Sequence, residues 1–222
     1  MRPLTRIAID GPVAAGKGTL GRALAHHFNF AYLDTGALYR ALALLAYNAN
    51  ITKPIQPEAV ATLVTRINPD LLASPALRTE NIGMIASKIA KIPAVRLALL
   101  DYQRRFGQCE SEHSPLPKGV ILDGRDIGTV VLPDAEVKFF ITASEKTRAQ
   151  RRLKELHDKG LNISFETVLN DLKTRDNNDM NRVEAPLRIA KDAFIIDNSE
   201  LNHQQALDMA IRRINEKIDD ID

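Results

Sequence analysis

The chain has 222 residues, of which 45% are hydrophobic and 26% charged, proportions typical of a soluble globular protein with a sizeable core. A net charge of +2 is too small to indicate bulk binding to nucleic acid or to a membrane surface. The single cysteine, Cys109, excludes an internal disulfide, and the longest apolar run, residues 41–47, is far shorter than the ~18 residues of a membrane span, so we expect a cytoplasmic protein.

Short apolar runs alternate with helical patterns along the chain. Strands are predicted at residues 6–10, 31–33, 120–123, 136–142 and 194–197. Helices are predicted at residues 17–28, 37–48, 57–67, 79–89, 93–106, 144–159, 165–177 and 202–217. This alternation favours an α/β fold, in which a parallel sheet is flanked by helices on both faces.

Two stretches carry helical patterns without an intervening strand. We expect one unit over residues 1–222, with a core formed by residues 1–50, 118–145 and 185–222. A helical insertion would span residues 51–107, and a short lid would span residues 146–182. In α/β proteins such insertions usually cover the carboxyl edge of the sheet, where ligands bind.

The segment "IAIDGPVAAGKGTL" has the spacing of a phosphate-binding loop, Gly11-x-x-x-x-Gly16-Lys17. It lies between an apolar strand and an amphipathic helix, so its backbone N–H groups and the helix N-terminus would converge on an anion. Lys17 would reach the outer phosphates of a nucleoside triphosphate. Gly18 has no hydroxyl, which leaves Thr19 as the nearest oxygen for Mg²⁺, and "GKGT" looks like the loop of nucleoside monophosphate kinases.

A phosphate loop alone leaves open whether water or a second substrate accepts the phosphoryl group. A kinase needs a second anion site, and two clusters at the ends of predicted strands supply candidates. "LDTGALYR" contains Thr35, a possible helix cap, followed by Tyr39 and Arg40. "ILDGRDIGT" presents Arg125 and Asp126, which could instead form a local ion pair.

Further arginines lie in the predicted lid. Arg175, Asp179 and Arg182 are spaced i, i+4, i+7, which places them on one helix face if the helix extends that far. Arg148 and Arg152 belong to the preceding helix. The alternatives are a solvated, salt-bridged surface and a set of charges that neutralises a transferring phosphoryl group.

Five segments, in order and spanning nearly the whole chain, together resemble bacterial cytidylate kinases: "DGPVAAGKGTL", "LDTGALYR", "IPAVRLALLDYQRRFG", "DGRDIGTVVLPDAEVKFFITAS" and "RDNNDMNRVEAPLRIAKDAFIID". "DGRDIGT" is the most specific, because adenylate kinases resemble one another in having a Gly-Phe-Pro-Arg run there. The resemblance implies a P-loop kinase that uses ATP with Mg²⁺ to convert CMP or dCMP into CDP or dCDP.

Carried over to this sequence, the resemblance implies roles for individual residues. The residues expected to bind ATP are Gly11, Pro12, Val13, Ala14, Ala15, Gly16, Lys17, Gly18 and Thr19, with Arg148 and Arg152 on the lid. Those expected to bind the acceptor are Thr35, Tyr39, Arg40, Ser87, Arg96, Arg125, Asp126, Arg175, Asp179 and Arg182. Lys17, Arg125 and Arg182 are the expected catalytic residues, and Thr19 the expected metal ligand.

The resemblance further implies that three of these residues would read the base: Ser87, Arg96 and Asp126. Cytosine offers acceptors at O2 and N3 to an arginine, and an amino donor at N4 to a carboxylate. Uracil reverses the pattern at N3 and position 4, so CMP should be preferred over UMP.

Three departures from the family pattern carry expectations of their own. Ala14 replaces a common glycine, which is tolerable only if this residue keeps a negative φ. Asn178 stands where an arginine is frequent, so the lid contacts should be weaker. Residues 68–80 show no strand pair, which relatives often carry, so the insertion should be shorter.

Three functions therefore remain distinct. The main expectation is a monomeric cytidylate kinase whose partners are ATP and CMP or dCMP, with no nucleic acid or membrane partner. A second is another P-loop kinase acting on UMP or a coenzyme precursor. A non-catalytic nucleotide switch is a third, and it would need none of Arg40, Arg125 or Arg182.

Overall fold

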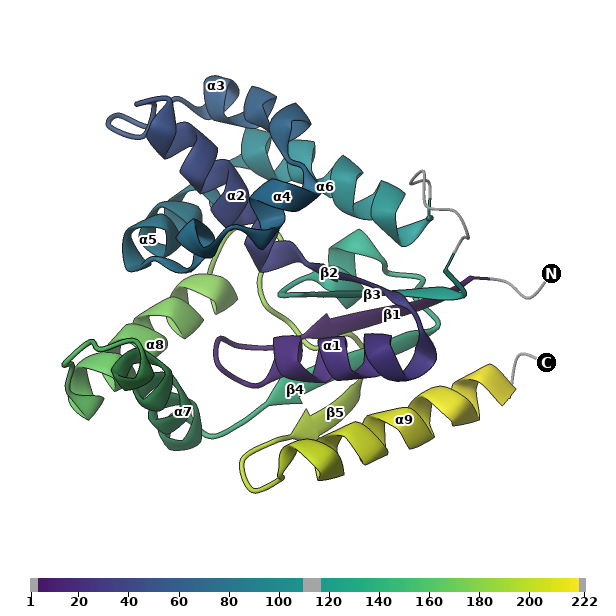
Figure 1. The fold of residues 1–222 in the computed structure, drawn as a ribbon. Helices are drawn as coiled ribbons and strands as arrows, with labels where there is room; N and C mark the ends of the chain where they lie inside the picture. Colours follow the sequence, from purple (N-terminus) through teal and green to yellow (C-terminus); the bar gives the residue numbers. More distant parts are fainter. Residues whose placement is uncertain (1–3, 110–116, 220–222) are drawn as a thin grey trace. The chain divides into compact units, whose positions relative to one another are not determined.

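A computed structural model describes residues 4–109 and 117–219 (Figure 1). The strands are β1 Thr5–Asp10, β2 Ala31–Asp34, β3 Gly119–Gly124, β4 Val137–Thr142 and β5 Phe194–Asp197. The α-helices are α1 Lys17–Phe28, α2 Thr35–Asn48, α3 Pro57–Thr62, α4 Pro69–Ala73, α5 Glu80–Ile89, α6 Pro93–Gly107, α7 Glu145–Asp158, α8 Phe165–Met180 and α9 His203–Asp219. Within these residues, no helix is both long and apolar enough to cross a membrane.

The strands form one five-stranded sheet in the order β2-β3-β1-β4-β5. The pairs β1–β3, β1–β4 and β4–β5 are parallel, and the register places Asp10 beside Gly124. All six residues of β3 are buried, as expected for a strand covered on both faces. The predicted parallel α/β sheet is therefore confirmed, and each predicted strand agrees with the observed one to within one residue at either end.

The chain divides into two compact units. The first, Met1–Leu33 with Glu112–Asp222, contains most of the sheet together with α1, α7, α8 and α9. Its main core packs the apolar faces of α1 and α9 against the inner strands, through residues such as Leu24, Phe139 and Ile214. Figure 1 shows both helices on the same side of the sheet.

The second unit, Asp34–Ser111, is helical and contains α2 to α6. The predicted insertion of residues 51–107 lies within it. Residues 68–80 form α4 and a 3₁₀ turn, Pro75–Arg78, so the expected absence of a strand pair there is confirmed. The predicted helix 57–67 was wrong in one respect: only Pro57–Thr62 is α-helical, and Leu63–Arg66 tightens into a 3₁₀ turn, as helix ends often do.

Candidate nucleotide-binding and phosphoryl-transfer site

The loop between β1 and α1 has a backbone that requires glycine at both ends. Gly11 has φ 148°, and a Cβ there would lie 1.9 Å from the carbonyl oxygen of Ile141. Gly16 has φ 99° and precedes the first residue of α1. Because L-residues with side chains rarely adopt these conformations, the two glycines fix the shape of the loop in front of the helix N-terminus.

Ala14 does not behave as the sequence predicted. Its φ is 59°, in the left-handed region, so the expectation of a negative φ was wrong. This conformation costs an alanine roughly 1–2 kcal/mol. Val13 and Ala14 also pack against an apolar cluster formed by α7 and α8, which includes Ala149 and Leu172. Packing between the loop and the lid helices therefore offsets part of the backbone strain.

Lys17 is buried, and its Nζ donates a hydrogen bond to the carbonyl oxygen of Pro12 at 2.8 Å. Burial and, to a lesser degree, the nearby positive charge of Arg125 together lower the pKa of Lys17 to about 7, against the attraction of Asp123, which raises it. The ammonium group thus lies in a water-poor site where anionic oxygens from a ligand would be strongly attracted. This is the position that the phosphate-loop pattern requires.

Two ion pairs join the "DGRDIGT" segment to the end of the lid. Arg125 Nε contacts Asp179 Oδ2 at 2.7 Å, and Arg182 Nη2 contacts Asp126 Oδ1 at 3.3 Å. Both acids are thus paired with distant arginines, and the alternative of a local Arg125–Asp126 pair is wrong. Side chains separated by more than 50 residues are brought together beside the phosphate loop.

The lid helix α8 ends at Met180, so Arg182 lies just beyond it rather than on its face. Arg175 is half-buried on α8, one turn before Asp179. The predicted i, i+4, i+7 face therefore holds for the first two residues only. Arg182 instead donates through Nε to the carbonyl oxygen of Ala185, which fixes the turn after the helix.

Arg148 is a buried residue, which excludes the surface-charge interpretation for this arginine. Its Nε donates to the carbonyl oxygen of Ala143 at 3.0 Å, and its Nη1 donates to that of Val13 at 3.2 Å. Nη2 pairs with the buried Asp176 at 2.7 Å. Arg148 thereby connects α7, α8 and the phosphate loop, whereas Arg152 pairs with Glu155 on its own helix.

The remaining predicted acceptor residues lie in the second unit. Arg40 pairs with Asp34 at 3.1 Å, and Arg96 Nη1 lies 3.3 Å from the Tyr39 hydroxyl. Ser87 is exposed on α5. Thr35 is buried and is the first residue of α2, not its cap: the Asp34 side chain accepts from the Ala37 N–H, which corrects the prediction.

Sequence reasoning missed two buried acids, Asp10 and Asp176. Burial raises the pKa of Asp10 to about 6, although its carboxylate accepts from the N–H groups of Gly128 and Ile127, which lower the pKa. A carboxylate at the end of an apolar strand, directly before the phosphate loop, is a signal that could have drawn attention to Asp10. No comparable local signal marks Asp176, which lies among polar residues on α8.

The oxygen groups beside α1 fit a hard divalent cation that arrives with phosphates. Thr19 is exposed in the first turn of α1, and a Cβ on the neighbouring Gly18 would lie 3.4 Å from Asp123 Oδ2. The Tyr32 hydroxyl donates to that carboxylate at 2.8 Å. Among the described residues, no group of three or more His, Cys, Asp or Glu could hold a metal by itself. Mg²⁺ in kinase sites commonly needs only one or two protein ligands in addition to phosphates and water.

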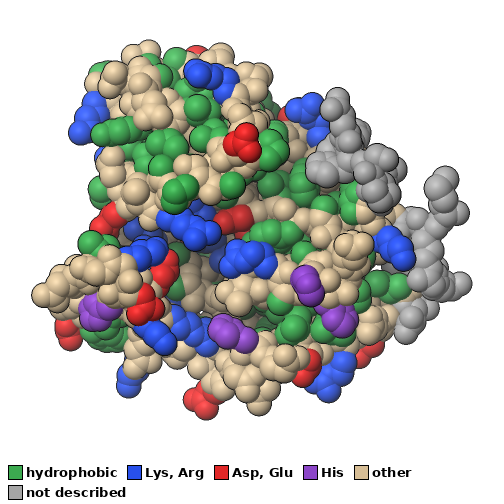
Figure 2. Space-filling model, viewed as in Figure 1, with side chains coloured by type: hydrophobic (Ala, Val, Ile, Leu, Met, Phe, Trp, Pro, Cys, Tyr) green, Lys and Arg blue, Asp and Glu red, His purple; other side chains and the backbone are tan. Residues whose placement is uncertain are grey.

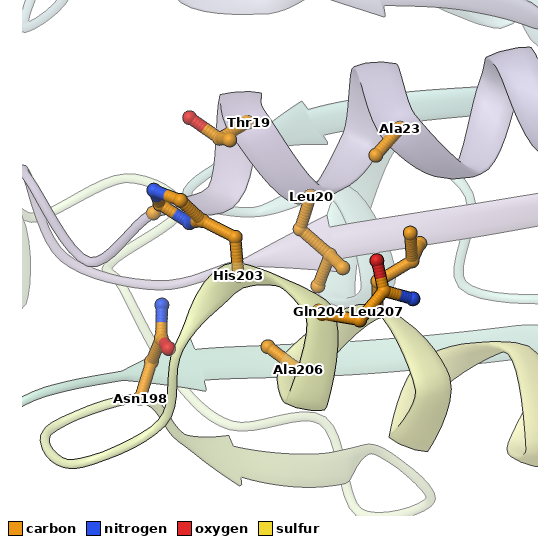
Figure 3. Close-up of a pocket in the computed structure, with 9 residues that line it drawn as sticks. Thr19, Leu20, Ala23, Asn198, His203, Gln204, Ala206 and Leu207 are labelled. Atoms are coloured by element: carbon orange, nitrogen blue, oxygen red, sulfur yellow. The ribbon is translucent and has the colours of Figure 1, made fainter.

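A small cavity of about 90 Å³ lies between α1 and α9 (Figure 3). Thr19, Leu20 and Ala23 line it from α1, and Asn198 lines it from the loop after β5. Typical ligand pockets measure ~300–1,000 Å³, so this cavity is too small to hold a nucleotide by itself.

In Figure 2, basic side chains are scattered over the visible face with acidic ones among them, in line with the net charge of +2.

The parallel sheet, the glycine-bounded loop after its first strand and the buried Lys17 together define a P-loop nucleotide-binding protein of the kinase type. The sequence model of the cytidylate kinase family matches residues 7–216. The chain belongs to this family.

Individual relatives agree with this assignment. A cytidylate kinase of Paramagnetospirillum magneticum is 49% identical over 213 residues, covering 96% of this chain and 99% of the relative. A cytidylate kinase of Methylobacterium sp. is 50% identical over 188 residues, covering 84% of this chain and 85% of the relative. Among solved structures, an uncharacterized protein from Eubacterium ventriosum has a TM-score of 0.55 at 16% identity, over 95% of this chain and 98% of that chain, a likeness of fold alone.

Proposed function

We propose that this chain transfers the γ-phosphoryl group of ATP, bound with Mg²⁺, to CMP or dCMP, giving ADP and CDP or dCDP. The observation that carries the proposal is the pairing of Arg125 and Arg182 with acidic residues beside the buried Lys17. A non-catalytic nucleotide switch has no need for a second group of arginines at this position, whereas a kinase needs a second anion site for the acceptor phosphate. The curated relatives named cytidylate kinase support the same reaction.

In this mechanism the protein positions two substrates and neutralises charge. The loop N–H groups and Lys17 bind the β- and γ-phosphates of ATP. Arg125 binds the phosphate of the acceptor, together with Arg40 and Arg175, and Asp179 meets its sugar. Arg182 neutralises the charge that develops on the transferring group, and closure of the lid, residues 146–182, excludes water.

Thr19 and Asp123 are the oxygen groups proposed to hold Mg²⁺, directly or through water. The ion supplies charge neutralisation at the phosphate oxygens. Asp123 is positioned for this role because Tyr32 donates a hydrogen bond to its carboxylate from the neighbouring strand.

We further propose that the protein is a monomer in the cytoplasm, which sedimentation and cell fractionation can test.

Asp126, Arg96 and Ser87 are proposed to read the base. Asp126 is 8% exposed and therefore little hydrated, so its carboxylate discriminates strongly between a donor and an acceptor. The N4 amino group of cytosine satisfies it, whereas the O4 carbonyl of uracil repels it. Arg96 and Ser87, in the second unit, would bind O2 and N3.

The direct test measures ADP release from the purified chain with MgATP and each of CMP, dCMP, UMP, AMP and GMP. Fast release with CMP and dCMP, and slow release with the others, is the expected result. Fast release with UMP alone would favour another P-loop kinase. ADP release without any acceptor would mean that water takes the phosphoryl group, and would contradict the proposal.

Replacing Asp126 with Asn is expected to lower kcat/KM for CMP ~10–100-fold more than for UMP, because the N4-facing acceptor is lost. Both substrates should also lose some activity, because Arg182 loses a charged partner. The measurement is the ratio of kcat/KM for CMP to that for UMP. Asp134→Asn is the matched control, because Asp134 also pairs with an arginine, Arg6, but does so at the start of β1, the end remote from the phosphate loop. An unchanged ratio in Asp126→Asn would make Asp126 structural.

A further inference from the structure

Asp10, the last residue of β1, is 3% exposed and uses both carboxylate oxygens. Oδ1 accepts a hydrogen bond from the backbone N–H of Ile127 at 2.8 Å, and Oδ2 accepts one from the N–H of Gly128 at 2.7 Å. These bonds link the strand that leads into the phosphate loop with a segment more than 110 residues away in the sequence.

The two N–H groups belong to the start of a π-helical segment, Ile127–Val131. Within this segment, the N–H groups of Val130 and Val131 donate to the carbonyl oxygen of Asp126. The first N–H groups of any helical turn have no acceptor within that turn and need a cap. No side chain next to the segment in sequence caps it, and Asp10 supplies both acceptors from another strand.

The contact depends on a close approach at Gly128. A Cβ at this position would lie 3.2 Å from Lys138 Cδ and 3.3 Å from Asp10 Oδ2. Both distances are tighter than ordinary van der Waals contact. The absence of a side chain at Gly128 therefore allows the N–H group to reach the Asp10 carboxylate without displacing Lys138.

Arg125 and Asp126 directly precede the capped turn, and the strand register places Asp10 beside Gly124. The four residues 125–128 are thus held between a sheet pairing at one end and the Asp10 cap at the other. We infer that Asp10 is a positioning residue, which fixes the backbone of this segment so that Asp126 reads the acceptor base and Arg125 meets its phosphate. The inference rests on the proposed function and assigns to Asp10 a role on the acceptor side, although it borders the ATP loop.

The first test is Asp10→Asn. The amide can accept one N–H but turns its own N–H₂ group toward the other, which leaves one buried donor unpaired. We expect kcat/KM for CMP to fall ~10–100-fold, chiefly through KM, and the CMP-to-UMP ratio to fall with it. KM for ATP should change by less than about threefold, since Lys17 and the loop glycines are intact.

Glu136→Gln provides the matched control. Glu136 also accepts from a backbone N–H, that of Arg6 at 2.7 Å, but it does so at the opposite end of β1. The same carboxylate-to-amide change there should lower the denaturation midpoint while leaving KM for CMP and the CMP-to-UMP ratio unchanged. At temperatures where Asp10→Asn and Glu136→Gln are both folded, a general loss of stability would change neither KM for CMP nor the CMP-to-UMP ratio.

Two further measurements keep the inference testable without relying on one variant. Gly128→Ala should shift the same kinetic quantities in the same direction as Asp10→Asn while retaining the carboxylate, because its Cβ separates the segment from Asp10. Amide hydrogen exchange at residues 127 and 128, followed by NMR, should be faster in Asp10→Asn than in wild type and unchanged in Glu136→Gln.

The outcomes separate the inference from the proposed function. Wild-type chain that releases no ADP with CMP would overturn the proposed function, while exchange at residues 127 and 128 would still report whether Asp10 holds the segment. Wild-type activity with CMP, combined with an unchanged KM for CMP and an unchanged base ratio in Asp10→Asn, would overturn the positioning role alone.

Discussion

Replacing Lys17 with Met is expected to reduce phosphoryl transfer to CMP by at least ~10³-fold, because the phosphate loop loses its side-chain cation in a water-poor site. The same change should leave the nucleotide-free protein at least as stable as wild type. Burial of the Lys17 ammonium is unfavourable, as its lowered pKa shows, and a methionine side chain of similar length fills the space without a charge. Turnover and the urea midpoint should therefore change in opposite directions, or the midpoint should remain unchanged.

The difference in stability between Lys17→Met and wild type should become smaller as the pH rises. The pKa of Lys17 is about 7 in the folded chain and 10.5 in the reference state, so the unfolded chain binds more protons between these values. In wild type, the free-energy cost of burying the charged Lys17 is therefore present in full below pH 7, and it decreases as the pH rises toward 10.5. The advantage of Lys17→Met in urea unfolding should shrink over the same range.

Lys138 offers a control with closely similar surroundings. It is also a buried lysine, 8% exposed, and its Nζ also donates to the carbonyl oxygen of a proline five residues earlier, Pro133. It differs in its ion pair with Asp192. Lys138→Met should lose that pair and some stability but keep turnover with CMP within about threefold. If Lys17→Met kept a comparable turnover, Lys17 could not be the phosphate-loop cation.

The inner strands β1, β3 and β4 were predicted closely because each is a mainly apolar and mainly buried run, the pattern expected of strands covered on both faces. The phosphate loop was equally readable, since its function requires a fixed spacing of residues between a strand and a helix. Local sequence contained all the information needed for these features.

Side-chain partners could not be predicted in this way. The spacing of Arg175, Asp179 and Arg182 suggested one helix face, but α8 ends before Arg182, which then reaches Asp126. Asp10 was overlooked because its two donors lie 117 and 118 residues away, and no local pattern records such a contact. Ala14 adopts a positive φ against the intrinsic preference of the residue, and its packing against the lid helices, which offsets part of the cost, is a tertiary contact that local sequence does not record.

Arg182→Lys is expected to lower kcat ~10²–10³-fold, somewhat less than the ~10³–10⁵ that an arginine acting only in the transition state contributes, because lysine keeps the charge. Lysine lacks the planar fork of donors that can contact two phosphate oxygens at once. The ion pair with Asp126 can persist, so KM for CMP and for ATP should change by less than about threefold. Steady-state kinetics over a matrix of both substrates separates kcat from the two KM values.

Arg6→Lys is the matched control for this change. Arg6 also forms a forked interaction, with Glu136 and Asp134, but it lies at the start of β1, the end remote from the phosphate loop. Arg6→Lys should lower the urea midpoint through the lost fork and leave kcat unchanged. If Arg182→Lys instead raised KM for CMP at constant kcat, Arg182 would bind the acceptor in its ground state, and the charge developing on the transferring group would have to be neutralised by Lys17 and Arg125.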